Sequence, residues 1–257
     1  MKKFILKLIL WIVILLILAI SLFAGLGYLK YKDATSKLSL SDAVNQIRSG
    51  EDYIKLEDIS QDYKNAVVAV EDHRFYSHKG IDVISMLRAT YVNIKSSSLT
   101  YGASTITQQV GRLLYFTQEK SPIRKFAEIF VAFDLEKNYS KDEILELYLN
   151  IIYFGNGYTG IHDASYGYFN KSPKDLTFYE ATYLAGLPNA PSVYSENDKL
   201  GEERRLQVVQ AVEKYCKEQS DFSRPLFSPI WVSKCNEEIS RAIAIIAFLY
   251  TRKWEIS

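Results

Sequence analysis

The sequence predicts a mainly α-helical protein with one N-terminal transmembrane helix. An uncharged apolar run extends from residue 8 to residue 29. Beyond it, apolar residues recur at three- and four-residue spacing, which is the period of a helix with one buried face. Few segments alternate with the two-residue period of a half-buried strand, so extended sheet is not expected.

The N-terminal apolar run is long enough to cross a bilayer. Its 22 residues form a helix of about 33 Å, against a hydrocarbon core of about 30 Å. Lys2, Lys3 and Lys7 precede it, which favours a cytoplasmic N-terminus and an extracytoplasmic domain. A signal peptide cleaved near Ala19-Ile20-Ser21 is the alternative. Because the apolar run continues past that point, an uncleaved anchor is favoured.

The anchor and the changes in composition suggest five segments. They are a cytoplasmic end, the anchor, a polar membrane-proximal stalk, the main domain and a helical tail, at residues 1–7, 8–29, 30–60, 61–210 and 211–257. In the main domain the apolar spacing predicts helices over residues 84–94, 106–114, 129–135 and 144–152. Residues 67–70 fit either a short strand or a helix end.

The tail contains a short apolar run and two cysteines. Its apolar run at residues 242–250 is too short to span a membrane and is expected to be a packing helix. Cys216 and Cys235 could pair outside the membrane, but their spacing does not reveal their distance.

Composition excludes several classes of protein. Lys and Arg number 31 against 30 Asp and Glu, so no basic field favours nucleic acid. Two cysteines exclude a disulfide-rich scaffold and a four-thiolate zinc site. Three histidines leave little for a histidine-based metal centre, so no metal ligands are predicted.

Glu71 is the first candidate for chemistry. It follows the apolar residues 66–70 directly, and His78 and Gly80 close the turn beyond it. A carboxyl group at the end of an apolar run is a candidate general base, because partial burial raises the pKa of such a group toward neutral pH. The alternative is that Glu71 lies at an ordinary charged helix terminus, beside a histidine whose ring nitrogens are hydrogen-bonded within the protein.

A polar segment of small residues then leads into a helix. Thr105 with Gln108 fits a capping box, and Arg112 lies about two turns further along. The free amides of a helix N-terminus suit an anionic or sugar ligand. The alternative is a capped helix after a loop, and no P-loop is present because the Gly-Lys-[Ser/Thr] ending is missing.

Arg124 and Lys125 lie within one helical turn of Glu128. Two basic residues beside a carboxylate can bind phosphate while the acid stays ionised. The alternative is an exposed surface ion pair, worth about 0.3–0.5 kcal/mol. Glu146 lies on a later helix, for which Ser140 is the expected N-terminal cap. It either positions residues of a binding site or faces solvent.

Together these segments resemble the peptidoglycan glycosyltransferases of glycosyltransferase family 51. The resemblance covers roughly residues 60–210 in five ordered blocks. The blocks are Glu71-Asp72-His73-Arg74-Phe75 with His78 and Gly80; Gly102-Ala103-Ser104-Thr105-Ile106-Thr107-Gln108-Gln109; Arg124-Lys125 with Glu128; Ser140-Lys141, Glu143-Ile144-Leu145-Glu146 and Tyr148-Leu149-Asn150 with Gly155 and Gly160; and Glu180-Ala181, Leu184-Ala185-Gly186-Leu187-Pro188, Ala190-Pro191-Ser192 and Tyr194.

The resemblance implies a lysozyme-like helical head with a smaller membrane-proximal jaw. It also implies polymerisation of lipid II into glycan strands. Glu71 matches the base that deprotonates the acceptor 4-hydroxyl, which attacks C1 of the donor MurNAc with inversion and releases undecaprenyl pyrophosphate. Glu128 matches the second carboxylate of the family. Residues 61–210 would then be the glycosyltransferase domain.

The matching blocks, and Arg112 three residues after the second of them, give the candidate substrate-binding residues: Asp72, Phe75, His78, Gly80, Gly102, Ser104, Thr105, Gln108, Gln109, Arg112, Arg124, Lys125, Glu146 and Asn150. Three positions depart from the family pattern. Arg112 replaces the usual Lys, so phosphate geometry can differ. Leu113 replaces an Asn, and Ser195-Glu196-Asn197 stands where a proline is often found.

The implied partners are lipid II, the growing glycan, membrane lipid and the division or elongation machinery. No cofactor is required by the residues, although carboxylates near a diphosphate can recruit Mg²⁺ or another divalent cation. The chain contains no Ser-x-x-Lys motif, which favours a monofunctional enzyme over a bifunctional one.

Two other functions remain as alternatives. One is a lysozyme-like lytic enzyme that cleaves finished glycan and needs no diphosphate-binding cations. The other is an inactive scaffold that binds lipid II. The basic residues oppose the first alternative, and the presence of both Glu71 and Glu128 opposes the second.

Overall fold

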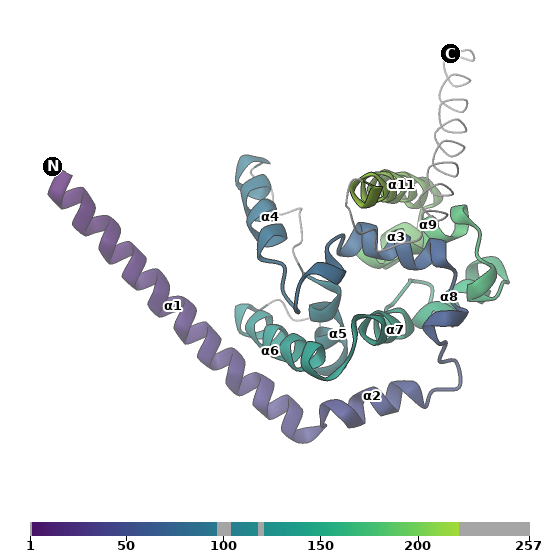
Figure 1. Ribbon diagram of the computed structural model, residues 1–257, viewed down its shortest axis with the longest axis horizontal. Helices are drawn as coiled ribbons and strands as arrows, with labels where there is room; N and C mark the ends of the chain where they lie inside the picture. Colours follow the sequence, from purple (N-terminus) through teal and green to yellow (C-terminus); the bar gives the residue numbers. More distant parts are fainter. Residues whose placement is uncertain (1, 97–103, 118–120, 221–257) are drawn as a thin grey trace, which may run out of the picture. The chain divides into compact units, whose positions relative to one another are not determined.

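The computed structural model describes residues 2–96, 104–117 and 121–220 (Figure 1). Over these ranges the secondary structure is helical, and extended pairing is limited to two isolated bridges, Lys79 with Ile81 and Tyr153 with Thr159. The predicted mainly α-helical fold class is confirmed. The expected Gly102 position lies outside the described residues.

The chain divides into two compact units, each built from two stretches of sequence. The first comprises Met1–Gly50 and Tyr76–Tyr148, and the second comprises Glu51–Phe75 and Leu149–Ser257. The units are described separately below.

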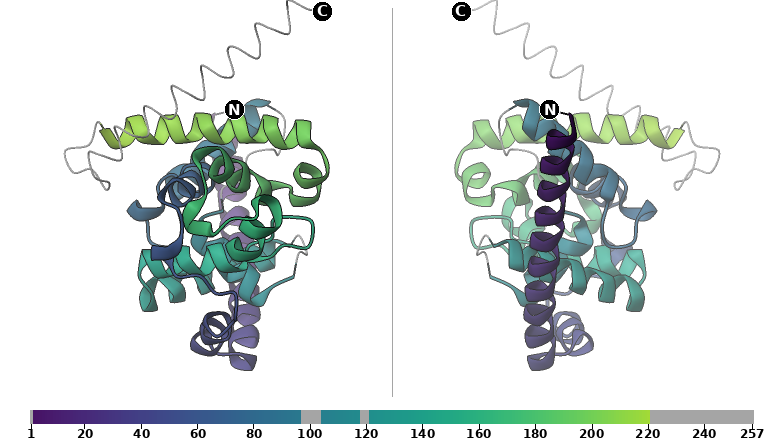
Figure 2. Two further views of the ribbon diagram at one scale, coloured as in Figure 1. Left: turned by 90° about the vertical axis from the view of Figure 1, so that its right-hand side faces the viewer. Right: turned by 90° about the vertical axis from the view of Figure 1, so that its left-hand side faces the viewer.

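Helix α1 (Lys2–Lys37) belongs to the first unit and is one uninterrupted helix, drawn in purple in Figure 2. Its span Lys3–Lys37 is long and apolar enough to cross a membrane, and its most apolar stretch is not buried against protein. The helix continues beyond residue 29 through the first residues of the expected stalk. Its C-terminal part packs along α6 (Pro122–Asn138).

The rest of the first unit is helical as well. It contains α2 (Leu40–Arg48), α4 (Val83–Ser96), α5 (Ile106–Tyr115) and the larger part of α7 (Lys141–Ile151). Helix α5 packs on α6, and both contribute fully buried residues, among them Ile106, Val110, Ala132 and Leu135. Helix α4 instead exposes a row of large apolar side chains: Val83, Ile84, Met86, Leu87, Tyr91 and Ile94.

The second unit is centred on three helices that pack on one another: α3 (Gln61–Glu71), α9 (Phe178–Gly186) and α11 (Asp198–Ser220). Around them lie α8 (Gly160–Phe169) and α10 (Pro191–Glu196). Residues 67–70 are helical, as part of α3. Val67 and Val68 are both buried, because α3 contacts both α9 and α11.

Short 3-10 turns connect the helices at Leu56–Asp58, Phe75–Ser77, Pro173–Asp175 and Leu187–Asn189. The four helices that apolar spacing predicted correspond to α4, α5, α6 and α7, the last of which ends at Ile151. Helix α11 continues across residue 210 and contains the buried Cys216. Cys235 and the run at 242–250 lie outside the described residues.

Candidate functional site

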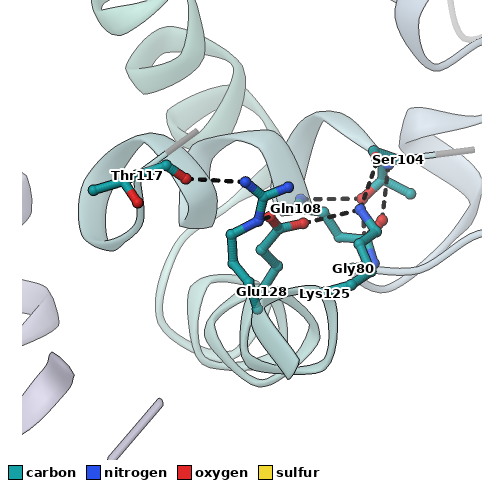
Figure 3. A network of polar contacts seen from close by, with 8 residues as sticks. Gly80, Ser104, Gln108, Thr117, Lys125 and Glu128 are labelled. Atoms are coloured by element: carbon teal, nitrogen blue, oxygen red, sulfur yellow. Dashed lines mark hydrogen bonds and ion pairs between the residues drawn. The ribbon is translucent and has the colours of Figure 1, made fainter. Parts of the chain in front are cut away.

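The N-terminal half of α6 carries a buried carboxylate between two cations. Pro122 at the first helical position begins the helix, and Arg124, Lys125 and Glu128 follow within two turns. The Lys125 Nζ atom donates a hydrogen bond of 2.9 Å to Glu128 Oε2, and Arg124 Nε lies 3.0 Å from Oε1 (Figure 3). Because Glu128 is only 1% exposed, this is not the exposed surface pair considered as an alternative.

The charges on this turn do not cancel. Two cations face one carboxylate, which leaves a net positive charge in a half-buried setting. Arg124 also donates to the carbonyl oxygen of Thr117 at 3.0 Å, so its guanidinium is held in place from a second side. A fixed excess of positive charge favours an anionic ligand, and diphosphate oxygens suit both ammonium and guanidinium donors.

Helix α5 is joined to this turn through its N-terminus. Lys125 Nζ donates to Ser104 Oγ at 2.5 Å, and the next residue, Thr105, caps α5. Thr105 Oγ1 accepts from the backbone N–H of Gln108, whose side chain accepts from the Thr105 N–H, so the predicted capping box is confirmed. The structure therefore links the second and third sequence blocks directly.

The same network reaches the first block at Gly80. Thr105 Oγ1 donates to the Gly80 carbonyl oxygen at 2.6 Å (Figure 3). Gly80 has a φ of +86°, and a Cβ there would lie 3.3 Å from the backbone of Ala132 on α6. Both the backbone conformation and the close approach require glycine.

Two glutamines and an arginine extend the site along α5. Gln108 is 1% exposed and Gln109 is 9% exposed, and Gln109 Oε1 accepts from the hydroxyl of Tyr148 at 3.3 Å. Arg112 is half-buried, and its Nε has no hydrogen-bond partner among the residues that the structure describes. A buried charged donor without a partner is costly, so a bound anion would stabilise this position.

Glu71 is the last residue of α3 and belongs to the second unit, whereas Glu128 belongs to the first. The side chain of Glu71 is half-buried. Complete burial and then the negative charge of Glu71 raise the pKa of Tyr63 well above its usual value. The carboxylate of Glu71 thus lies close enough to Tyr63 to act on it electrostatically.

Asp72 and Phe75 shape the chain directly after Glu71. Asp72 is buried, and its N–H ends α3 by donating to the Val68 carbonyl oxygen at 3.0 Å. Its own carbonyl accepts from the N–H of Phe75, which is fully buried. These contacts give Asp72 and Phe75 a clear structural contribution, whatever they add to binding.

Three further predicted residues are His78, Glu146 and Asn150. His78 is buried and lines a cavity of about 600 Å³ with residues that include Glu136 and Lys141. Glu146 is half-buried on α7. The side-chain amide of Asn150 pairs with the backbone of Ile54. Asn150 Oδ1 accepts from the Ile54 N–H at 2.8 Å, and Asn150 Nδ2 donates to the Ile54 carbonyl oxygen at 2.9 Å.

The structure also shows polar residues that sequence reasoning missed. Thr107 Oγ1 donates to Glu136 at 2.6 Å, and Lys141 pairs with the same carboxylate at 2.7 Å. Helical spacing could have found Thr107, since it lies on the buried face of α5. In the second unit, Asp52 and Asp163 both contact His162 Nδ1, at 3.3 and 3.2 Å, and these three residues could supply metal ligands.

Known proteins resemble most of this sequence. A transglycosylase family model matches residues 40–213, which include every block described above. A putative transglycosylase of Cupriavidus necator is 41% identical over 198 residues, which cover 76% of this chain and 85% of the relative.

Matches to larger proteins are confined to part of each. Penicillin-binding protein 1F of Bacillus subtilis is 47% identical over 142 residues, covering 55% of this chain and 20% of the relative. Penicillin-binding protein 1A of Neisseria gonorrhoeae is 49% identical over 144 residues, covering 56% of this chain and 18% of the relative. The chain thus spans about a fifth of each penicillin-binding protein. With the matched family model covering more than half of its length, the chain belongs to the transglycosylase family.

Proposed function

We propose that this chain is a peptidoglycan glycosyltransferase that polymerises lipid II into glycan strands. In the reaction, the 4-hydroxyl of an acceptor GlcNAc attacks C1 of the donor MurNAc, the configuration at C1 inverts, and undecaprenyl pyrophosphate departs. The observation that carries the proposal is the buried Glu128 held between Arg124 and Lys125, with positive charge in excess. Membership of the transglycosylase family supports it.

Glu71 is the proposed general base. A sugar hydroxyl is a weak nucleophile, and a carboxylate that accepts its proton during attack accelerates the reaction by about 10²–10⁴-fold. Glu71 suits this task because its side chain is half-buried at the end of α3 and still partly accessible. The bond from oxygen to C1 forms as the bond from C1 to the diphosphate breaks, and the proton passes to Glu71.

Arg124, Lys125 and Arg112 are the proposed diphosphate-binding residues. A diphosphate is already a good leaving group, so catalysis needs charge neutralisation more than proton donation. Lys125 is fixed between Ser104 and Glu128 and is therefore preorganised rather than mobile. Glu128 positions both α6 cations. A divalent cation would add charge neutralisation of the same kind, and a chelator tests for one.

Helix α1 is the proposed membrane anchor, with its N-terminus in the cytoplasm and the helical units outside. Lipid II cannot leave the bilayer, so an anchored enzyme meets it at a high effective concentration. The exposed apolar side chains of α4 are proposed to contact lipid in the same leaflet. The division or elongation machinery remains a proposed protein partner.

The proposal is tested with the full chain in detergent and labelled lipid II, with and without a chelator. The wild type should form polymer and release undecaprenyl pyrophosphate, and Glu71→Gln should lower the rate by about 100-fold or more. Glu57→Gln, an exposed acid of the same unit, is the matched control and should retain the wild-type rate.

Two outcomes would contradict the proposed reaction, and a third would contradict the role of Glu71 alone. Release of fragments from purified sacculi, without polymer from lipid II, would identify a lytic enzyme. Binding of lipid II by the wild type without turnover would identify a scaffold. Wild-type activity of a folded Glu71→Gln variant would remove Glu71 from the role of base.

A further inference from the structure

Gly27 of the anchor helix lies directly against the helix that carries the anion-binding turn. Gly27 is buried, and a Cβ at this position would overlap the Cβ of Phe126. It would also lie 3.1 Å from the backbone nitrogen of Ala127. Phe126 and Ala127 fall between Lys125 and Glu128, so this close contact of α1 with α6 coincides with the charged turn. Any side chain at residue 27 would push that turn away.

A second set of contacts lies further towards the C-terminal ends of both helices. The hydroxyl of Tyr31 donates to the carboxylate of Asp134. The rings of Tyr28 and Tyr31 lie 5.3 and 5.8 Å from the ring of Phe130. Residue numbers rise together along the two helices, from Gly27 at Phe126 to Tyr31 at Asp134. The helices therefore run in the same direction where they touch.

The position of this contact along α1 sets the depth of the charged turn relative to the membrane. The uncharged run of α1 ends at residue 29, and Lys30 and Lys32 follow it. Gly27 is thus within about 5 Å, along the helix axis, of the first charge on the outer side. The contact with Phe126 brings Lys125 and Glu128 to the same level. If α1 spans the bilayer, this level is that of the lipid headgroups.

We propose that Gly27 is a positioning residue that fixes the Arg124–Lys125–Glu128 turn at headgroup depth, where the diphosphate of a lipid-linked substrate lies. The inference rests on the proposed function, since it concerns how the same site meets its substrate. It adds that the anchor sets the depth of the site in the membrane as well as holding the protein there. The rate of polymerisation should therefore depend on how the apolar length of α1 matches bilayer thickness.

The first test compares two glycines of α1. Gly27→Leu should lower the rate of lipid II polymerisation in phosphatidylcholine vesicles by about tenfold or more, because a misplacement of about 1 Å can cost 100-fold. Gly25→Leu is the matched control and should stay within about twofold of wild type, because nothing lies within 4 Å of a Cβ at Gly25. Gly27→Ala serves if the leucine variant does not fold. Equal rates for the variants at both glycines would overturn the inference.

The second test moves the site in depth while leaving the α1–α6 contact intact. Deletion of residues 15–18, whose side chains are exposed, shortens the apolar run by about 6 Å. Rates are measured in vesicles that differ only in acyl-chain length, from dimyristoyl- to dierucoyl-phosphatidylcholine. The wild type should show an optimum, and the deletion should move that optimum to shorter acyl chains. A contact that only stabilised the fold would leave the optimum in place.

Assays in detergent separate this inference from the proposed function. A wild type that makes no polymer in detergent or in vesicles would refute the function itself. A wild type that is active in detergent and equally active at every acyl-chain length would overturn the positioning role alone. The same holds if the deletion variant keeps the wild-type optimum.

Discussion

Lys125 Nζ lies 2.9 Å from Glu128 Oε2, one helical turn away, and 2.5 Å from Ser104 Oγ. One ammonium group therefore connects the buried acid of α6 to the residue that precedes the cap of α5. Thr105 continues the connection to Gly80. Residues from three separate sequence blocks thus depend on one another for their positions, and substitutions at any of them should affect the others.

Replacing Lys125 with methionine should strongly reduce activity and lower stability. The methionine keeps the length of the side chain but leaves Glu128, which is 1% exposed, with Arg124 as its one remaining cation partner among the described residues. We expect the polymerisation rate to fall by about 100-fold and the free energy of unfolding to fall by about 1–3 kcal/mol. Initial rates and denaturant unfolding measure the two effects.

Lys137→Met is the control for this substitution, because Lys137 lies on the same helix and is exposed. Its stability should stay within about 0.5 kcal/mol of wild type. If Lys125→Met matched this control in both measurements, the assignment of Lys125 would be wrong.

Two threonine caps allow a test of the network apart from helix capping. Thr105→Ala and Thr177→Ala each remove a capping box, at α5 and α9 respectively. Each should lower the free energy of unfolding by about 0.5–2 kcal/mol. Thr105→Ala also loses the bond to Gly80 and should lower the polymerisation rate, whereas Thr177→Ala should retain it. Equal rates for the two variants would show that capping alone matters at Thr105.

Glu180 should make the stability of the fold depend on pH in the acid range. Burial alone would raise the pKa of this carboxyl group, but hydrogen bonds from Lys171 and Thr177 outweigh burial and hold the pKa below its usual value. A carboxyl group with a lowered pKa stabilises the fold above its unfolded-state pKa, and this stabilisation is lost as the pH falls through the folded-state value. Thermal unfolding between neutral pH and the acid range should therefore show a steeper loss for wild type than for Glu180→Gln. Identical pH profiles would rule out this contribution.

Asn150 should stabilise the fold because its side-chain amide hydrogen-bonds the backbone of Ile54, as a neighbouring backbone segment otherwise would. Both polar groups of the Ile54 backbone are paired with the Asn150 amide. Asn150→Ala leaves them without these bonds and should cost about 1–3 kcal/mol. Asn138→Ala, which loses one exposed bond to the Asp134 carbonyl, is the control and should change stability by less than about 0.5 kcal/mol. Denaturant unfolding distinguishes the two, and similar values would mean that water replaces the Asn150 amide.

The sequence by itself determined the features that depend on near neighbours. The capping box needs only Thr105 and Gln108, three residues apart, so its pattern is visible in the sequence and is present in the structure. The apolar period placed the helices, and the length of the uncharged run marked α1 as a candidate membrane span. The spacing of Arg124, Lys125 and Glu128 on one helix predicted an ion pair.

Tertiary structure alone decided whether that ion pair is buried. Glu128 lies almost wholly out of solvent because α1 and α5 both pack on α6, at Gly27 and at Gly111, where a Cβ would meet Val131 at 3.0 Å. The tertiary structure also divides the first sequence block between the two units, with Glu71 and Phe75 in one unit and Gly80 in the other. Neighbours along the chain fix hydrogen bonds within a helical turn, but burial depends on which distant faces meet. The fit of one helix against another is a property of many side chains together, and no short stretch of sequence contains it.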